Sequence, residues 1–178
     1  MIRLEGRRIV LRDWRRNETE AMHRWLGNVL VTRYLSWGAR TRHDSARHLR
    51  ECIDEQKKPY RTRFFLAIEL KESGLVIGDA GFQWTSTARE GHVGYFVEPA
   101  FWGRGYATEA AAMLLAFAFD VCGATSMTAS CDARNLASER VMQKLGMQRN
   151  EARETPGRRA YVVKRDNPAP AAARRRTR

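Results

Sequence analysis

The sequence of 178 residues has few cysteines and no long apolar run, and each shortage excludes a class of protein. Its three scattered cysteines (Cys52, Cys122 and Cys131) cannot all pair and form no CxxC motif, which favours a reduced, cytoplasmic protein. The longest apolar run, Ala110 to Phe119, is half of the roughly 20 residues that a membrane span needs. The first residues lack the apolar region of a signal peptide, so we expect no secretion and no membrane partner.

Acidic residues are also in short supply. The chain has 20 acidic against 32 basic residues and a net charge of +12, of which the segment 164–178 carries only part. The body is therefore basic by itself, which predicts an anionic partner: a nucleic acid, a phosphorylated cofactor or an acidic protein. Solubility alone is the plain alternative reading of this charge.

What the chain does contain is enough apolar residues, 43%, for one globular domain with its own core. We place this domain at residues 1–166. Residues 167–178 consist of proline, alanine, arginine and a few polar residues with nothing to bury, so we expect a disordered tail there.

The pattern of apolar residues predicts a mixed α/β fold. An early hairpin, with its turn at residues 71–74, argues for a mixed rather than a wholly parallel sheet. Capping patterns open two helices, at Asn17 with Glu20 and at Thr41 with Asp44. Expected strands are 8–12, 64–70, 75–84, 91–97, 127–131 and 160–164; expected helices are 17–26, 41–53, a buried helix through 114–121 that ends at Gly123, and 136–145.

A glycine-spaced turn stands between the strand 91–97 and the buried helix. The first amides of a helix lack internal partners and lie at the positive end of its dipole, and Gly103 and Gly105 allow a ligand to approach the backbone closely. The amides from Gly103 to Thr108 can therefore hold a phosphate or diphosphate. A tight turn that merely uses glycine is the alternative. A Walker A loop and a Rossmann fingerprint are both excluded by spacing.

Two segments, in this order and spacing, resemble a known family. Residues Trp102–Ala110 look like the acetyl-CoA pyrophosphate loop and following helix of the GNAT N-acetyltransferase superfamily. Residues Asn135–Met147 look like the second hallmark of its ribosomal-protein-acetylating (Rim-type) branch, and the resemblance extends over nearly everything from Ile2 to Lys164. It implies the GNAT fold, an α/β fold with a mixed central sheet of about six to seven strands flanked by helices. Trp102 departs from the Arg or Gln of the family pattern.

The resemblance also implies acetyl-CoA as the acetyl donor. Free backbone groups of the strand before the loop would pair with pantetheine, and an amide near Phe96 or Val97 would polarise the thioester carbonyl. Asn135 would hydrogen-bond pantetheine, cap a helix, or do both. The residues assigned to acetyl-CoA are Tyr95, Phe96, Val97, Trp102, Gly103, Arg104, Gly105, Tyr106, Ala107, Thr108, Asn135, Ser138 and Lys144.

Two residues are assigned to catalysis by the same resemblance. His92 lies where many relatives carry a glutamate that deprotonates the amine, and a neutral imidazole has a suitable pKa. An exposed strand histidine is the alternative reading, with Glu151, Glu154 or water in reserve as the base. Ser138 matches the family's proton donor to the thiolate. His43 and His48 do not share a helical face, so we expect no metal site.

The acceptor is the least specified part. Aromatic residues of the regions that vary within the superfamily suit either a peptide N-terminus or an amphipathic amine, and the positive charge of the body disfavours a highly cationic acceptor. We favour a protein N-terminal α-amine over a small free amine. A sensor that binds CoA without catalysis, and a basic nucleic-acid-binding domain, are the alternatives from other classes, and the resemblance disfavours nucleic acid. Dimers occur among such relatives, so a homodimer is compatible with it. The residues considered for the acceptor are Trp25, Tyr34, Trp37, Arg40 and Trp84.

Overall fold

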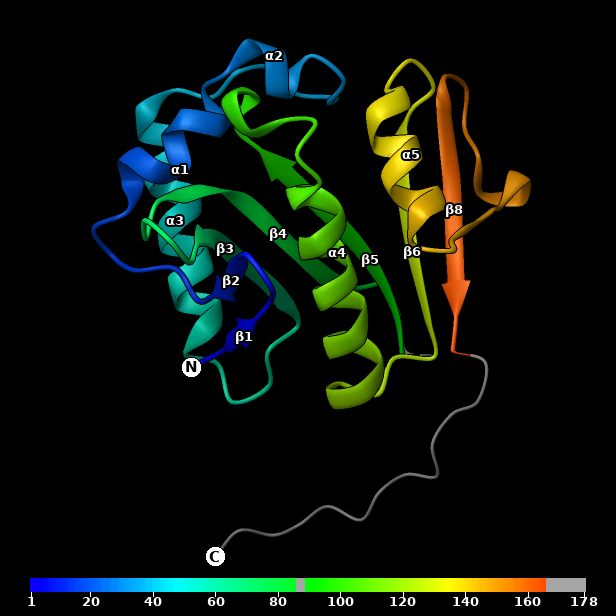
Figure 1. The fold of residues 1–178 in the computed structure, drawn as a ribbon, viewed down its shortest axis with the longest axis horizontal. Coiled ribbons are helices and arrows are strands. Elements are labelled where there is room, and N and C mark those ends of the chain that lie inside the picture. Colours follow the sequence, from blue (N-terminus) through cyan, green and yellow to red (C-terminus); the bar gives the residue numbers. More distant parts are fainter. Residues whose placement is uncertain (86–88, 166–178) are drawn as a thin grey trace, which may run out of the picture.

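The computed structural model describes residues 1–85 and 89–165, and the tail expected at 167–178 lies outside them. Within these residues one mixed sheet holds eight strands in the order β1-β2-β3-β4-β5-β6-β8-β7 (Figure 1). This confirms the predicted mixed α/β fold, with one or two strands more than expected. The strands are β1 Arg3–Glu5, β2 Ile9–Arg12, β3 Arg63–Leu70, β4 Val76–Trp84, β5 Glu90–Val97, β6 Ser126–Asp132, β7 Gln148–Arg149 and β8 Arg158–Lys164.

Helices cover both faces of the sheet. The near face in Figure 1 carries α4 and α5, and the largest apolar cluster lies between them and the strands. A second cluster, which includes Trp14, Trp25 and Leu49, packs α1 and α3 on the opposite face. No helix in the described part of the chain is long and apolar enough to cross a membrane. The helices are α1 Thr19–Leu26, α2 Val29–Thr32, α3 Arg42–Gln56, α4 Tyr106–Ala116 and α5 Leu136–Lys144.

Only one of the two predicted caps is present. Thr41 and Asp44 form a reciprocal capping box at the start of α3, with the Asp44 N–H donating to Thr41 Oγ1 at 3.1 Å. The expected pair of Asn17 and Glu20 is wrong: α1 begins at Thr19, after Glu18, and no side chain caps it. The Glu18 carboxylate instead accepts hydrogen bonds from the Arg12 guanidinium of β2, at 2.5 and 3.0 Å.

The central helix is buried as predicted, except at its end. Ala110, Ala111 and Leu114 of α4 have no exposed surface. The chain then continues as one π-helical segment, Phe117–Val121, and Val121 is 72% exposed, so the expectation that it is buried is wrong. The short elements β1, α2 and β7 were not predicted, because two to four residues are too few to show a period.

The sheet is divided between β5 and β6. All other neighbouring strands are antiparallel, whereas these two are parallel and pair over only a short stretch before they diverge (Figure 1). Beyond this stretch each strand has an edge that no other strand covers. The paired positions are Glu90 with Ser126, Gly91 with Met127, and His92 with Thr128.

One carboxyl group is buried in the second apolar cluster. Asp79 of β4 is 3% exposed, and its Oδ2 accepts a hydrogen bond from the Trp14 indole at 3.1 Å. Burial raises the pKa of Asp79 to about 7, and the Trp14 hydrogen bond only partly opposes this. The folded protein therefore keeps a proton that the unfolded chain releases above its ordinary pKa of 3.8.

Stability should consequently fall as the pH rises from about 4 to about 7, because the unfolded state binds fewer protons over this range. We expect Asp79→Asn to remove this part of the dependence. Between pH 4 and pH 8 the unfolding free energy of the wild type should therefore fall by on the order of a few kcal/mol more than that of the variant. Denaturant titrations of both proteins at these two pH values measure the change, and an equal change in the two would contradict it.

Candidate active site

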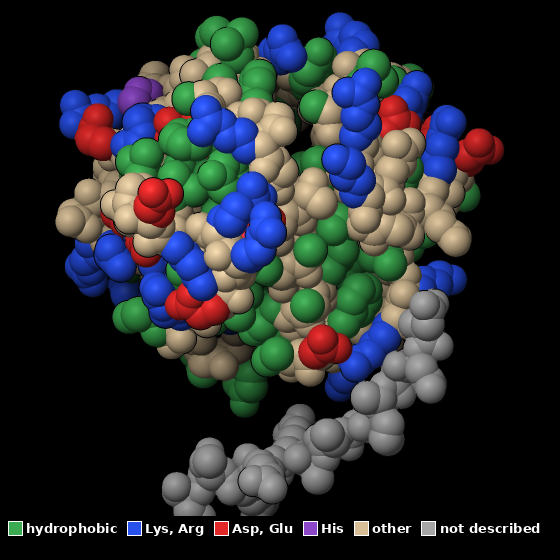
Figure 2. Space-filling model, viewed as in Figure 1, with side chains coloured by type: hydrophobic (Ala, Val, Ile, Leu, Met, Phe, Trp, Pro, Cys, Tyr) green, Lys and Arg blue, Asp and Glu red, His purple; other side chains and the backbone are tan. Residues whose placement is uncertain are grey.

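A cavity of about 820 Å³ lies where β5 and β6 diverge. Its lining comes from both strands, from the turn before α4, from α5, and from α2 with the loop after it. Figure 2 shows this face hollowed between α4 and α5, with Lys and Arg side chains on both sides. The volume falls within the range of small-molecule and cofactor sites, so the cavity is the candidate active site.

The turn before α4 presents unpaired backbone amides to this cavity. Gly103 and Gly105 have φ values of 74° and 81°, in the left-handed region that favours glycine. None of the consecutive amides from Gly103 to Thr108 donates to a protein acceptor in the described residues, and Gly105 caps α4 with no side chain. A Cβ at Gly103 would meet nothing within 4 Å. The turn is thus an open cradle of N–H groups, as predicted, and its donors suit an anion.

An ion pair between Arg8 and Glu109 supports this turn. Arg8 Nε donates to Glu109 Oε2 at 2.8 Å, and Arg8 Nη1 donates to the Arg104 carbonyl at 2.8 Å. The Arg8 guanidinium also stacks over the Tyr106 ring, 4.6 Å from its centroid. Arg8 therefore compensates the one acidic side chain in the first turn of α4 and fixes the loop conformation. The sequence analysis missed this pair, since about a hundred residues separate its members.

The backbone of β5 offers fewer free groups than expected. The Glu98 N–H donates to the Ile77 carbonyl at 2.8 Å, so alternation along the strand directs the backbone of Phe96 toward β4 and that of Tyr95 and Val97 toward the gap. Of the two amides expected to be free, that of Phe96 therefore faces β4, and only that of Val97 faces the gap. Trp102 Nε1 donates to the Val97 carbonyl at 2.6 Å, which leaves the Val97 N–H facing the gap.

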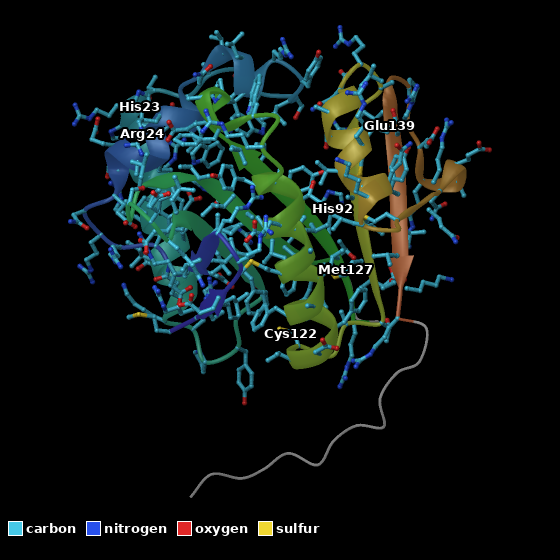
Figure 3. All side chains as sticks on the ribbon, in the orientation of Figure 1. His23, Arg24, His92, Cys122, Met127 and Glu139 are labelled. Atoms are coloured by element: carbon cyan, nitrogen blue, oxygen red, sulfur yellow. The ribbon has the colours of Figure 1, made fainter. Side chains whose placement is uncertain are left out.

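His92 lies where the two strands begin to part; in the view of Figure 3 its label falls in the space that separates α4 from α5. Its Nδ1 is 3.1 Å from Thr128 Oγ1, and that hydroxyl donates its single proton to the Gly91 carbonyl at 3.0 Å. Nδ1 must therefore carry the proton and donate to Thr128, which leaves Nε2 with a free lone pair in the neutral ring. Burial, and then the charge of Arg158, hold the pKa of His92 below its ordinary value.

Tyr95 and Ser138 meet across the gap. The Tyr95 hydroxyl lies 3.0 Å from both Ser138 Oγ and the Ser138 carbonyl oxygen. Burial raises the pKa of Tyr95 to about 12, so the phenol keeps its proton at physiological pH. Asn135 caps α5 by accepting a hydrogen bond from the Ser138 N–H at 3.1 Å, and it also lines the cavity. The Tyr95 side chain is a site residue that the sequence analysis considered only for its backbone.

Most of the predicted site residues line one cavity, and the exceptions have other partners. The Arg104 side chain does not line it and instead lies over the Phe101 ring. Glu154 accepts two hydrogen bonds from Arg149, at 2.7 and 2.9 Å, and neither it nor Glu151, the two carboxylates held in reserve as the base, lines the cavity. Those that line it are His92, Tyr95, Phe96, Val97, Trp102, Gly103, Gly105, Tyr106, Ala107, Thr108, Asn135, Ser138 and Lys144.

Some of the residues considered for the acceptor line the cavity, and others lie outside it. Tyr34 and Trp37, from the loop after α2, line the cavity. Arg40 lies outside it, over the Trp37 ring at 4.6 Å from the centroid, and Trp25 and Trp84 are also outside. Within residues 1–85 and 89–165 no group of three His, Cys, Asp or Glu side chains could hold a metal ion.

Comparisons with known proteins agree with this geometry. Residues 8–148 match the family model described as an acetyltransferase (GNAT) domain. A relative named as an uncharacterized N-acetyltransferase, YnaD of Bacillus subtilis, is 24% identical over 143 residues, which are 80% of this chain and 81% of that protein. The chain belongs to the GNAT acetyltransferase family and is an N-acetyltransferase.

Solved structures share the fold. A GNAT-family acetyltransferase from Bacillus anthracis superposes with a TM-score of 0.79 at 22% identity, covering 92% of this chain and 98% of that one. RimL, a ribosomal L7/L12 α-N-protein acetyltransferase solved in complex with coenzyme A, superposes with a TM-score of 0.74 at 15% identity and the same coverage. Structural neighbours thus include ribosomal-protein acetyltransferases, as the resemblance implied.

The hydrogen bonds of His92 give a prediction that needs no substrate. In ¹⁵N NMR spectra His92 should be the Nδ1-protonated tautomer, with a pKa below 6.5 that rises in Arg158→Gln because a nearby positive charge is removed. Thr128→Val should lose this tautomer preference, whereas Thr128→Ser, which retains the hydroxyl, should keep it. A valine variant with the wild-type tautomer would show that Thr128 does not set it.

Proposed function

We propose that this enzyme transfers the acetyl group of acetyl-CoA to a protein N-terminal α-amine, by direct attack of the amine on the thioester. The observation that carries the proposal is that one cavity joins two kinds of site through the gap between β5 and β6. Unpaired amides lie at the start of α4, and His92 lies where the strands part. A cytoplasmic location is part of the proposal, and all three cysteines are free thiols.

The residues around the turn fit acetyl-CoA. The amides from Gly103 to Thr108 would receive its diphosphate at the positive end of α4. Lys144 and Arg140 line the cavity from α5 and would add positive charge beside the phosphates. Asn135 caps α5 with its Oδ1 and keeps its NH₂ group available toward a pantetheine arm. When bound, acetyl-CoA supplies an activated acetyl group and a thiol leaving group.

Three groups of the chain would then act on the reaction. Nε2 of His92, free of a proton in the neutral ring, would take a proton from the attacking amine, directly or through water. The Val97 N–H faces the gap and would stabilise negative charge on the carbonyl oxygen. Ser138 Oγ, joined to the Tyr95 hydroxyl at 3.0 Å, would return a proton to the leaving sulfur.

The aromatic wall after α2 supports a peptide acceptor. Tyr34 and Trp37 line the cavity beside Leu30 and Leu35, so this wall offers apolar contacts to the residues that follow the amine. A protein N-terminus combines such residues with an α-amine of low pKa, near 8, which a histidine can deprotonate. A lysine side chain or polyamine would be harder to deprotonate, and the basic lining disfavours it.

The glycine turn yields a test of the donor site. Gly105→Val should reduce the affinity for CoA by at least about tenfold, because the side chain is strained at a φ of 81° and obstructs the N–H cradle. Gly74→Val is the matched control, since Gly74 has a φ of 70° in the β3–β4 turn, away from the cavity. Calorimetric titration with CoA compares the two; equal affinities would contradict the assignment of the turn.

The proposed base gives the test of the activity itself. His92→Ala should lower kcat for peptide N-terminal acetylation by roughly 10²- to 10⁴-fold, with CoA affinity retained. In the wild type, activity should rise with pH through a value below 6.5, because only the neutral ring acts as a base and its pKa is lowered. Thiol release measured on a panel of peptides and small amines tests both points. Equal loss of CoA affinity would instead make His92 a structural residue, and turnover of small amines alone would contradict the peptide acceptor.

A further inference from the structure

Arg158, the first residue of β8, is a half-buried arginine with no carboxylate partner in residues 1–85 and 89–165. Within those residues its side chain makes one hydrogen bond, from Nη2 to the neutral Ser130 hydroxyl at 3.1 Å. Two other arginines with little exposed surface do have carboxylate partners: Arg12 binds Glu18 and Glu69, and Arg61 binds Asp13 at 2.6 Å. Because a charge removed from water is costly unless it is paired, the free guanidinium of Arg158 indicates a partner from outside the chain.

Strand alternation places Arg158 on the acceptor side of the cavity. Met127 and Cys131 of β6 point into the core under α4 and α5, where the donor site lies, so Thr128 and Ser130 point to the other face. Arg158 pairs with Asp132 in the β6–β8 ladder and therefore shares this second face. His92 is on it as well, since it contacts Thr128. Arg158 thus faces the proposed base rather than the amides of the α4 turn.

The acidic side chain opposite Arg158 in the ladder forms its ion pair with another arginine. Asp132 is the one acidic residue among the described residues that line the cavity. It binds Arg134 with both oxygens, through Oδ1 to Nε at 2.9 Å and Oδ2 to Nη2 at 2.8 Å, and this holds the pKa of Asp132 well below its usual range. Arg33, over the Tyr34 ring, adds a further positive charge to the same mouth. The acceptor side of the cavity is therefore electropositive.

We infer that Arg158 binds a carboxylate of the acceptor, and that the preferred acceptor is an N-terminus with Asp or Glu at its second residue. This rests on the proposed function. Arg158 binds Ser130, and His92 binds Thr128, two residues away on β6. Two residues along a strand are about 7 Å apart, so Arg158 and His92 are held at points separated by about this distance. An α-carboxylate of a free amino acid lies too close to its own amine to span this distance, whereas an acidic side chain one residue further along reaches it.

The test uses two peptides that differ in one group, one beginning Ser-Asp and the other Ser-Asn, with the remaining residues identical. The wild-type enzyme should show a kcat/KM about tenfold or more higher for the Asp peptide, mostly through KM, as expected for one charge-assisted pair. Arg158→Gln should abolish this preference and leave the KM for acetyl-CoA unaltered, and Arg158→Lys should keep part of it. Arg50→Gln, at an exposed site on α3 away from the cavity, removes the same charge and should retain the preference.

Direct binding of the same peptides to the CoA-loaded enzyme separates the two proposals. Acetylation of both peptides at equal efficiency, unaffected by Arg158→Gln, would overturn the inference while the proposed function stood. Arg158-dependent binding of the Asp peptide without acetylation would support the inference and contradict the proposed function. A raised KM for acetyl-CoA in Arg158→Gln would assign the residue to the donor and overturn the inference, as would failure of both peptides to bind.

Discussion

The site depends on the early parting of β5 and β6. A parallel pair that continued along both strands would pair the backbone of Tyr95 and Val97 within the sheet and leave no passage between its faces. Because pairing stops after His92 and Thr128, the gap remains open and one cavity connects the amides before α4 with the opposite face. Side chains from both faces of the sheet can therefore line the same cavity.

The two sides of this gap carry positive charge of different origin. At the α4 turn the charge is that of backbone dipoles, and it is preserved because Arg8 compensates Glu109 in the first turn of the helix. On the other face it is the formal charge of Arg158, whose side chain binds the Ser130 hydroxyl while Asp132 binds Arg134. In the proposed reaction, a phosphorylated donor and an acidic acceptor would therefore approach from opposite sides and bind different groups.

Features that depend on residues close together in the chain could be predicted from the sequence. The Thr41 cap and the Gly103 to Gly105 turn are local patterns, and both are present. The cap expected at Asn17 is absent: α1 begins after Glu18, whose carboxylate binds Arg12 of β2. The same holds for the site, whose glycines and His92 could be named from the sequence. Three other features depend on contacts between distant segments: the Thr128 hydroxyl beside His92, the Arg8–Glu109 pair behind the turn, and the position of Arg158.

A crystal structure of the enzyme with bound CoA tests the account most directly. The account predicts the diphosphate on the amides from Gly103 to Thr108, and the thiol inside the gap between β5 and β6, within reach of Ser138. A diphosphate bound at any other place, or a thiol directed away from the gap, would contradict it.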